Sequence, residues 1–411
     1  MKKKIVFVIN YFYPDFASTG QLMTSLCLHL QDKFDITVIA AQPGYAGQKS
    51  EVAERFATDY LENIRIVRIK LPVLDKSSKW SRLRYITSYF FLATWAMLME
   101  KKTDIVYTIS SPPILGGLIG TIGKVLKRTK HVYNIQDFNP EQAEAVSFTK
   151  MKWMYSLARG LDNLNCKLAD HIITVGRDMQ ETLAKRFGYR GVPDNSVINN
   201  WTEENEIVPL TKDHPQVRAF LEENGLTDRF IVMYSGNLGL YYDLENIITV
   251  TKHFADDERV AFVFIGEGAV KGRMQQFVKE HGLKNVLFLP YQPKDYIRYS
   301  LNAADVHLVV NQKGIKGVSV PSKIYGVMAS GKPILGVLEN GSEAHRLIME
   351  SESGYVVEPQ DYRGITACIE AMAATDSAEL RRMGLNGRTY LESYLKKEQS
   401  IEKYSLLLES I

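Results

Sequence analysis

The stretch from residue 230 to residue 248, FIVMYSGNLGLYYDLENII, decides the fold. It begins with five apolar residues, turns at Gly236 and Gly239, and continues with the mixed polar and apolar pattern of a helix. An apolar run that ends in a glycine turn and leads into a helix is typical of a strand–helix unit in a parallel sheet. Glycines also let a phosphate approach the backbone N–H groups at the start of the helix. The stretch therefore predicts a parallel sheet with a nucleotide site at one edge.

Apolar runs of the same kind recur along the chain in two series, with helix-like stretches between them. Their continuous apolar character indicates parallel strands that are buried on both faces. Two such series predict an α/β fold with two doubly wound, Rossmann-like domains facing each other across a cleft. The runs are residues 4–10, 35–41, 64–69, 104–110, 131–135 and 171–175, followed by 230–236, 260–266, 285–290, 305–310 and 332–337.

A polar, acidic segment at residues 197–215, which ends at Pro215, predicts the boundary between the domains. Its acidic run at 203–205 is interpreted as a solvated linker. The predicted domains are residues 1–203 and 204–385, and residues 386–411 are expected to form C-terminal helices that pack back towards the N-terminal domain.

The composition excludes several classes of protein. The chain has 411 residues, of which 45% are hydrophobic and 24% charged, as in an ordinary large globular protein. A net charge of +3 is too small to indicate a nucleic-acid partner. The three cysteines are far apart, which indicates a reduced compartment and no metal cluster. The apolar run near the N-terminus ends at Ile9, too early for a secretory signal, so it is interpreted as the first strand.

Three more turns of small residues follow predicted strands. The first leads into a helix from about Gly20, with Ser18 or Thr19 available as its N-cap. It has no G-x-G-x-x-G pattern, which disfavours an ordinary dinucleotide site, and it can also be a plain strand–turn–helix joint. The second, at residues 263–277, combines a Gly-Glu-Gly turn with Lys271 and Arg273 in the first helical turn, where they face a phosphate or simply lie on a solvated helix face.

The last turn belongs to residues 314–337, GIKGVSVPSKIYGVMASGKPILGV. Pro321 is expected to be the first helical residue, with Ser322 and Lys323 beside it, and the helix is expected to end at Gly331. Ligands of open α/β sheets bind at the carboxyl ends of the strands, so these loops together predict a bound nucleotide.

Seven segments resemble bacterial glycosyltransferases of the GT-B fold, from retaining family four. The similarity is to the O-antigen and colanic-acid type, such as the N-acetylfucosaminyltransferases. The segments follow the order seen in the family and span nearly the whole chain. They are YFYPDFASTGQ, DIVYTISSPPILGG, YNIQDFNPEQA, ADHIITVGRDM, MYSGNLG, FIGEGAVKGRM and VPSKIYGVMASGKP.

The resemblance implies a nucleotide-diphosphate sugar in the C-terminal domain and an acceptor in the N-terminal one. The glutamate pair usual in the family falls on Val318 and Gly326, and the usual arginine and lysine fall on Asn237 and near Tyr242. Backbone N–H groups and Lys323 are then expected to bind the diphosphate. The predicted donor-binding residues are Gly20, Gly236, Asn237, Glu267, Lys271, Arg273, Ser322, Lys323 and Glu343.

Asp137 is the predicted catalytic residue. It follows the run at 131–135, in a segment where similar enzymes often have Asp-Leu-Trp-Pro-Glu. There it would orient the acceptor hydroxyl or the donor sugar, and the alternative is an aspartate that caps the next helix.

Residues 85–99 contain no charge but are too short to span a bilayer, for which about 20 apolar residues are needed. They form either a buried helix or a face that dips into an anionic membrane. The second alternative is favoured by the basic block from Arg68 to Lys130, which has twelve Lys or Arg against three acids. The predicted acceptor and membrane face consists of Trp80, Arg82, Arg84, Lys101 and Lys102.

The predicted function is transfer of a sugar, UDP-linked by resemblance alone, to a polyprenyl-diphosphate-linked saccharide in surface polysaccharide biosynthesis. The resemblance implies a cytoplasmic enzyme, peripheral on the inner face of the plasma membrane, with no cofactor and no metal. A sugar-nucleotide epimerase shares the architecture and is one alternative. A non-catalytic member of a polysaccharide assembly complex is the other, because the glutamate pair is missing.

Overall fold

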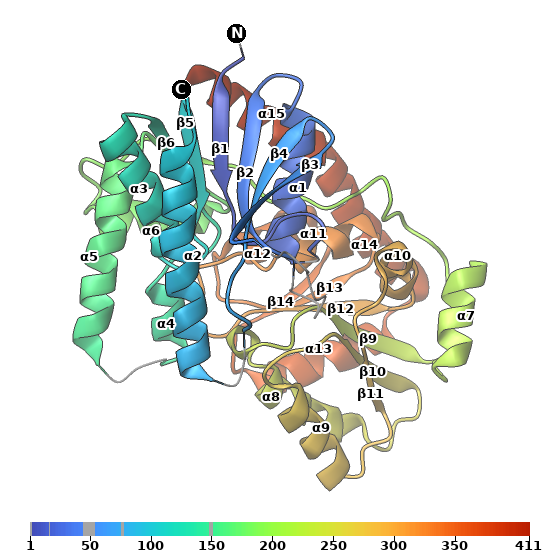
Figure 1. The fold of residues 1–411 in the computed structure, drawn as a ribbon. Coiled ribbons are helices and arrows are strands. Elements are labelled where there is room, and N and C mark those ends of the chain that lie inside the picture. Colours follow the sequence, from blue (N-terminus) through green and yellow to red (C-terminus); the bar gives the residue numbers. More distant parts are fainter. Residues whose placement is uncertain (1, 16, 44–53, 75–77, 148–150) are drawn as a thin grey trace. The chain divides into compact units, whose positions relative to one another are not determined.

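The structure is a computed structural model that describes residues 2–15, 17–43, 54–74, 78–147 and 151–411. The chain divides into two units, each built around its own sheet (Figure 1). The first unit comprises residues 1–144, 149–199 and 401–411, and the second comprises residues 145–148 and 200–400.

The first sheet has the order β3-β4-β2-β1-β5-β6-β7-β8. Neighbouring strands pair in parallel, apart from β3 with β4, which are antiparallel. The chain crosses from one side of β1 to the other between β4 and β5, so the topological switch point lies between β1 and β5. The strands are β1 (Lys4–Val8), β2 (Asp35–Ala41), β3 (Phe56–Leu61), β4 (Ile64–Ile69), β5 (Ile105–Ile109), β6 (Lys130–Ile135), β7 (His171–Thr174) and β8 (Asn195–Val197).

Six of these strands are the first series of apolar runs, and β3 and β8 are additional. The side chains of β3 are exposed or half-buried, because β3 is the edge strand and pairs only with β4. An edge strand does not need the apolar run that marks a strand buried on both faces. The other edge strand, β8, has three residues, none of them fully buried.

The helices of the first unit cover the sheet. The structure corrects the start of the first helix, which begins at Ser18 with Ala17 as its N-cap, so neither Ser18 nor Thr19 caps it. The helices of this unit are α1 (Ser18–Leu30), α2 (Lys79–Met99), α3 (Leu115–Lys127), α4 (Glu141–Ala145), α5 (Lys152–Leu168), α6 (Arg177–Arg186) and the C-terminal α15 (Lys397–Ser410). Residues of α15 from Ile401 onwards belong to this unit.

Packing between α2, α3 and the sheet forms the core of the first unit. Tyr89, Ala93 and Met97 of α2 are buried with Ile119 of α3 against strand residues such as Val106. Glycines bring α3 very close to β6: a Cβ atom on Gly120 would lie 1.9 Å from Nε2 of His131. The opposite side of α3 therefore faces away from the sheet.

The second sheet has the order β11-β10-β9-β12-β13-β14, with parallel pairing throughout. Its switch point lies between β9 and β12. The strands are β9 (Phe230–Ser235), β10 (Val260–Ile265), β11 (Val286–Leu289), β12 (Val306–Val310), β13 (Ile334–Val337) and β14 (Gly354–Val357). The first five are the second series of apolar runs, while β14 is a half-exposed edge strand with a weaker pattern.

The helices of the second unit include those that follow the three predicted phosphate-binding loops: η1 and α8 after Gly239, α9, and α11. Pro321 is not the first helical residue, because α11 begins at Lys323 with Ser322 as N-cap, and Gly331 follows its C-cap with a φ of +63°. The helices are α7 (Pro215–Glu223), η1 (Leu240–Tyr242), α8 (Leu244–Ile247), η2 (Ile248–Phe254), α9 (Lys271–Glu280), α10 (Lys294–Asn302), α11 (Lys323–Ala329), α12 (Glu343–Ser351), α13 (Tyr362–Ala374) and α14 (Ser377–Tyr394).

The acidic run at 203–205 is not the solvated linker that its composition predicts. Glu204 is buried, and its carboxylate accepts a hydrogen bond from the backbone N–H of Lys397 at 3.2 Å. Glu203 pairs with the Nζ of Lys397 at 2.8 Å. Both carboxylates therefore lie at the N-terminus of α15, where the helix dipole favours negative charge.

Candidate donor site

The loops after β9 and β10 are joined through their backbones at the carboxyl edge of the second sheet. The N–H of Leu238 donates to the carbonyl of Glu267 at 2.9 Å, and the N–H of Val270 donates to the carbonyl of Leu238 at 3.0 Å. A Cβ on Gly266 would lie 2.0 Å from the Gly236 carbonyl oxygen, and a Cβ on Gly268 would lie 2.1 Å from that of Leu238. The glycines of the two turns are therefore needed for the loops to touch.

Lys323 comes from the other side of the switch point, from the first turn of α11, and reaches the β9 loop. Its Cε would be 3.3 Å from a Cβ on Gly236. Its Nζ donates to the hydroxyl of Tyr234 at 2.6 Å, and this hydroxyl donates to the carbonyl of Asn237 at 2.7 Å. Lys323 and the Gly236 turn therefore form one cluster at the topological switch point, where ligands of open α/β sheets bind.

Two aromatic rings enclose the ammonium group of Lys323. Its Nζ lies 4.2 Å from the ring centroid of Tyr234 and 3.9 Å from that of Tyr242. Among the residues that the structure describes, no carboxylate forms an ion pair with it. Burial away from water lowers the pKa of Lys323 to about 7. An anion that entered the site would supply the missing counter-charge.

Tyr242 occupies the place where the resemblance puts a lysine. Because its ring packs against the ammonium group of Lys323, the cation at this position comes from α11 instead of from the β9 loop. The tyrosine cage is the part of the site that sequence reasoning missed. Tyr234 lies inside an apolar strand and is fully buried, so its pattern is that of an ordinary core residue.

The remaining donor-binding candidates of the second unit are spread over several surroundings. Lys271 lies beside the glycine turn, where its Nζ contacts the Gly266 carbonyl at 3.0 Å and a carboxylate oxygen of Glu267 at 2.6 Å. Arg273 is paired with Glu245 of α8 at 2.5 Å, and both side chains are exposed. Asn237 is exposed at the tip of the turn, and Ser322 is half-buried.

Glu343 is buried in the first turn of α12, where Ser342 caps the helix. A carboxylate at this position interacts favourably with the helix N-terminus. A second acidic residue, Glu339, accepts hydrogen bonds from the backbone N–H groups of Gly314 at 2.8 Å and Lys316 at 3.0 Å. Glu339 therefore holds the loop between β12 and α11 in place. The only signal of this residue in the sequence is its position just after β13.

The two positions that lack the family glutamates differ from each other. Val318 is buried, so its side chain belongs to the core. Gly326 lies in the middle of α11, and a Cβ there would meet nothing closer than 3.8 Å, the distance to Leu301 Cδ1. A methyl group would therefore fit in ordinary van der Waals contact at the position where the resemblance puts a carboxylate.

Gly20 and Asp137 lie in the first unit. Gly20 is in the first turn of α1, where a Cβ would lie 3.0 Å from the carbonyl oxygen of Tyr11, so close packing accounts for the glycine. Asp137 follows β6. Its N–H donates to Ser110 Oγ at 3.1 Å, and its Oδ1 accepts from the Gln142 side-chain amide at 3.0 Å. Both residues are thus at the carboxyl edge of the first sheet.

A buried arginine holds the segment that carries Asp137. Arg186 of α6 forms ion pairs with Glu141 and with Asp162, the latter at 2.6 Å, and donates to the carbonyl of Asn139 at 3.0 Å. Its guanidinium lies 4.4 Å from the ring centroid of Phe138. Together with the other ion pairs of the segment, Arg186 keeps the pKa of Glu141 below its usual value despite burial.

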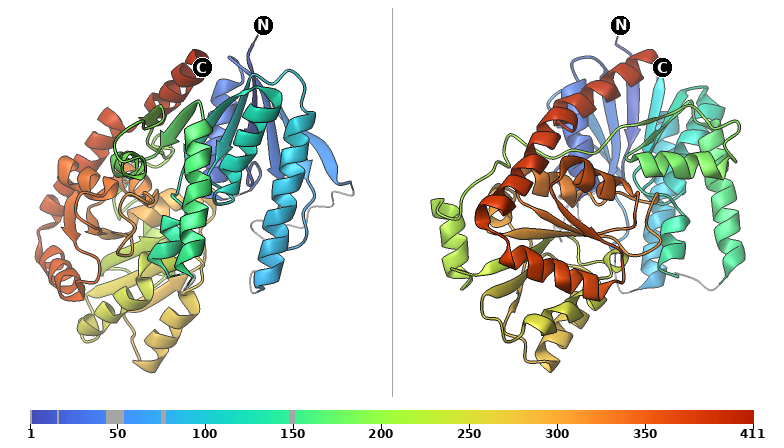
Figure 2. Two further views of the ribbon diagram at one scale, coloured as in Figure 1. Left: turned by 90° about the vertical axis from the view of Figure 1, so that its left-hand side faces the viewer. Right: turned by 180° about the vertical axis from the view of Figure 1, so that it is seen from behind.

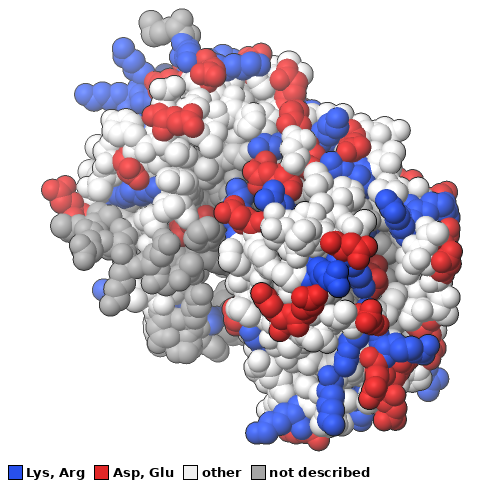
Figure 3. Space-filling model, turned by 90° about the vertical axis from the view of Figure 1, so that its right-hand side faces the viewer, with Lys and Arg blue, Asp and Glu red and all other residues white. Residues whose placement is uncertain are grey.

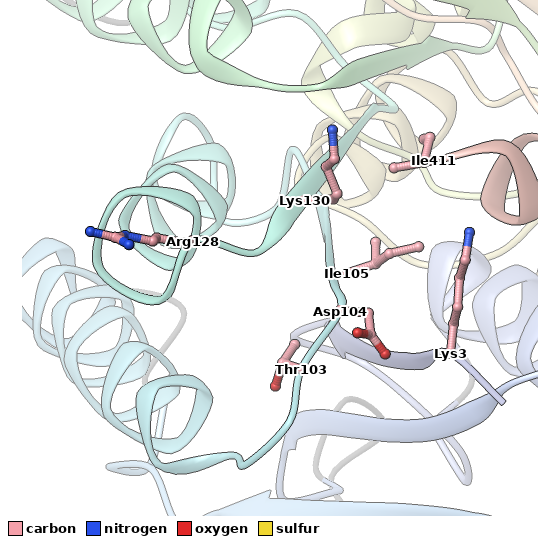
Figure 4. Close-up of a pocket in the computed structure, with 7 residues that line it drawn as sticks. All are labelled: Lys3, Thr103, Asp104, Ile105, Arg128, Lys130 and Ile411. Carbon is pink, nitrogen blue, oxygen red and sulfur yellow. The ribbon is translucent and has the colours of Figure 1, made fainter. Parts of the chain in front are cut away.

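A cavity of about 250 Å³ opens at the other edge of the first sheet, at the amino ends of β1, β5 and β6 (Figure 4). Three of its charged groups already have partners: Lys3 donates to the carbonyl of Glu409, Asp104 accepts from the N–H of Lys4, and Lys130 pairs with Asp170. Because ligands of such sheets bind at the carboxyl edge, we assign no function to this cavity.

Residues 217–390 match the family of glycosyl transferases group 1, and this range contains the joined glycine loops, Lys323 and the tyrosine cage. These residues form a glycosyl transferases group 1 domain. Two relatives of this glycosyltransferase agree with the match. The probable glycosyltransferase WbjE of Pseudomonas aeruginosa is 27% identical over 82% of each chain. The putative colanic acid biosynthesis glycosyl transferase WcaI of Escherichia coli K12 is 24% identical over 98% of each chain.

Solved structures give the glycosyltransferase the GT-B fold. Sucrose-phosphate synthase from Thermosynechococcus elongatus superposes with a TM-score of 0.76 at 16% identity, covering 100% of this chain and 99% of that one. Anabaena HepE in complex with UDP superposes with a TM-score of 0.74 at 14% identity, covering 99% and 100%. The expected fold class of two Rossmann-like domains is confirmed.

Proposed function

We propose that this glycosyltransferase transfers a sugar from a nucleoside diphosphate to a lipid-linked saccharide during surface polysaccharide biosynthesis, with retention of configuration at the sugar. The donor would be UDP-linked, such as an N-acetylated hexosamine or deoxyhexosamine. Two comparisons support this choice: HepE was solved with UDP, and the name of WcaI assigns it to colanic acid biosynthesis.

The observation that carries the proposal is the caged ammonium group of Lys323 beside the glycine turn at Gly236. A diphosphate needs a cation and several N–H donors, and helix N-termini with glycine turns supply the donors. The chain has no glutamates at Val318 and Gly326 to bind the sugar and ribose, so affinity would depend more on the diphosphate than in relatives that keep them.

The proposed reaction breaks the bond between the anomeric carbon of the donor sugar and its phosphate oxygen. The acceptor hydroxyl oxygen forms the new bond on the same face, and its proton goes to an oxygen of the departing diphosphate. The protein would contribute positioning and stabilisation of the charge that develops on the diphosphate. Lys323, beside the turn at Gly236, supplies that charge stabilisation, and Lys271 lies beside the neighbouring turn at Gly266.

We assign to Asp137 the orientation of the acceptor hydroxyl or the donor sugar. The variant Asp137→Asn keeps the size of the side chain and can still accept from Gln142, so the fold should persist. It should lower turnover by about 100-fold or more, the range expected for a positioned polar group, while UDP affinity stays within about twofold. Unchanged turnover in this variant would remove Asp137 from the site.

An acceptor that is linked to a polyprenyl diphosphate places the reaction at the inner face of the plasma membrane. We keep Trp80, Arg82, Arg84, Lys101 and Lys102 as the proposed acceptor and membrane face. All five are exposed, in the first turns of α2 or directly after its end. In the described part of the chain, no helix is long and apolar enough to cross a bilayer.

Thermal unfolding with UDP, GDP, ADP or no ligand, each with EDTA and with magnesium, tests the donor site. A ligand that binds only the folded state raises the unfolding midpoint, and the rise grows with the logarithm of its concentration divided by Kd. We expect a rise with UDP that EDTA does not change, since the proposed reaction uses no metal. If no nucleotide raises the midpoint, the proposed donor site is wrong.

A further inference from the structure

Three neighbouring helices of the first unit, α2, α3 and α5, have apolar side chains on the surface that faces away from the sheet. They lie side by side along one face of that sheet (Figures 1 and 2), and α3 contacts both of the others. We call this outer surface the three-helix face. It consists of Trp80, Leu83, Phe91, Trp95 and Met99 of α2, Val125 and Leu126 of α3, and Trp153, Met154, Leu157 and Leu164 of α5, all of them exposed.

The exposed residues of α2 follow one line along the helix. Leu83, Phe91, Trp95 and Met99 are spaced by multiples of four residues, and Phe91 is 67% exposed. The opposite side of α2 is equally apolar and packs in the core, for example through Tyr89 and Met97. A helix that is apolar all round belongs in a core or against lipid, and the described part of the chain packs against one side of α2 only. Its outer side therefore lacks a covering partner among the described residues.

Helix α5 repeats the pattern with a separate set of residues. Trp153, Leu157 and Leu164 lie on one side, with Leu157 68% exposed, while Asp162, Asn165 and Cys166 are buried on the other. Side chains of this size rarely form a continuous exposed patch on a soluble monomer unless the patch binds a partner. The sequence did not reveal this stripe, because basic and polar residues interrupt it.

The charges of the three helices identify the kind of partner. Helices α2 and α3 contain no Asp or Glu, and the one acid of α5, Asp162, is buried against Arg186. The same helices contain eight basic residues: Lys79, Arg82, Arg84, Lys124, Lys127, Lys152, Arg159 and Lys167. Three of the eight have protein partners, since Lys124 pairs with Asp170, Arg159 pairs with Glu141 and Glu144, and Lys127 donates to the carbonyl of Met97. On the face drawn in Figure 3, by contrast, acidic and basic side chains are interspersed.

We propose that the three-helix face binds an anionic phospholipid bilayer, with its tryptophans and leucines in the interfacial layer and its basic side chains at the lipid phosphates. Apolar stripes next to cations, with tryptophan among the apolar residues, are typical of helices that lie in a membrane surface. A second copy of the chain would bring the same cations together and is disfavoured for that reason. The proposal deepens the proposed function, from which it takes a membrane-anchored acceptor.

The tryptophans of the chain allow a direct measurement. Three of the four, Trp80, Trp95 and Trp153, are exposed on this face, and the fourth, Trp201, is buried in the second unit. The full chain is mixed with vesicles of phosphatidylcholine, with or without phosphatidylglycerol, that contain brominated acyl chains. We expect quenching of most of the fluorescence and a blue shift with the anionic vesicles, and weaker effects with the neutral ones. Absence of quenching with both kinds of vesicle would overturn the proposal.

Variants test whether vesicle binding requires the three-helix face or is non-specific adsorption of the protein to lipid. Trp95→Glu and Leu157→Glu place a charge on α2 or α5, and each should weaken vesicle binding by at least about tenfold, because each loses the burial of one large apolar side chain. Leu406→Glu is the matched control, since Leu406 is exposed on α15, away from the three helices. Equal losses in all three variants would contradict the proposal.

Two further measurements show whether a negative result refutes the lipid-binding face or the donor site. UDP-induced stabilisation of the same variants in solution reports the donor site alone, so a protein that binds UDP but no vesicle refutes the lipid face and leaves the donor site standing. Sedimentation without lipid reports self-association. A dimer that Leu157→Glu dissociates, together with no vesicle binding, would assign the face to a second copy and overturn the proposal.

Discussion

Burial removes water from the ammonium group of Lys323, and two tyrosine rings are its new neighbours. The interaction of an ammonium group with aromatic rings is worth only about 0.5–2 kcal/mol. That is too little to offset burial, which explains why the pKa falls to about 7. A free lysine would be fully charged at neutral pH, whereas this one is charged in about half of the molecules. Because a bound anion would favour the charged form of Lys323, the partly neutral lysine of the free protein understates the affinity of the site for an anion.

The variant Lys323→Met removes the charge and keeps the length of the side chain. A charge-assisted hydrogen bond contributes about 1.5–3 kcal/mol, so UDP affinity should fall by about 10-fold to 100-fold. Isothermal titration with UDP measures the change, and urea unfolding serves as the control, since the fold should be at least as stable without a buried, unpaired cation. An unchanged dissociation constant would exclude Lys323 from the site.

The lowered pKa also gives UDP binding a pH dependence. A bound diphosphate favours the charged lysine and raises its pKa above the value of about 7 in the free protein. Affinity is then fully present below pH 7 and declines as the pH rises between the free and the bound pKa, by up to about tenfold per pH unit. Titrations from pH 7 to about pH 9 should show this decline in the wild type and a nearly flat profile in Lys323→Met.

At the scale of elements, the contact between the β9 and β10 loops depends on glycine at two positions. Replacing Gly268 by Ala forces a methyl group against the backbone carbonyl of Leu238. A backbone atom cannot move aside cheaply, so we expect a loss of about 1–3 kcal/mol in unfolding free energy and weaker UDP binding.

Gly272 is the matched control for that change. It lies four residues later, in the first turn of α9, where a Cβ would meet no atom within 4 Å. Gly272→Ala should stabilise the protein by about 0.5–1 kcal/mol through helix propensity. Urea unfolding of both variants tests the pair, and equal effects of the two substitutions would show that the loops need no close contact.

Helix α6 fixes the Asp137 segment through Arg186. The variant Arg186→Met leaves Glu141 and Asp162 without their buried cation and should cost about 3–5 kcal/mol at neutral pH. The half-buried Arg159 pairs with Glu141 and Glu144, and Arg159→Met should cost less than about 1 kcal/mol.

The pH dependence of this cost follows from Glu141. Its folded pKa is depressed, so its contribution is present above its ordinary value of 4.5 and is lost as the pH falls through the folded value. The deficit of Arg186→Met should therefore shrink in acid, as urea unfolding at about pH 4 and pH 7 can show. A deficit independent of pH would mean that the ion pairs do not hold the segment.

At the scale of the whole molecule, the sequence predicted the fold from runs such as 230–235 and 260–265, because strands buried on both faces must be apolar throughout. It missed β3, β8 and β14, because edge strands are half-exposed and need no such run. It located Lys323 beside a helix start, but the cage around it joins Tyr234 and Tyr242 from the far side of the switch point. Such a contact has no local pattern and comes only from the topology of the sheet.

The acidic run at 203–205 shows the same limit. Its composition is that of a linker, and only the return of the chain at Lys397 gives its carboxylates a helix N-terminus to cap. The composition of this short charged segment predicts a linker, whereas the role of its carboxylates depends on a partner almost two hundred residues away.

Helix α15 completes the first unit, although it follows the second unit along the chain. In that unit, the buried side-chain amide of Asn134 donates to the hydroxyls of Tyr107, at 2.6 Å, and of Tyr404 on α15, at 2.9 Å. On the ribosome, residues 1–199 therefore cannot complete this unit until α15, which follows the second unit, has been synthesised. Until then a nascent chain would expose the surface against which Ile401, Tyr404 and Leu408 are buried, and a chaperone that recognises apolar surfaces could bind it throughout the synthesis of the second unit.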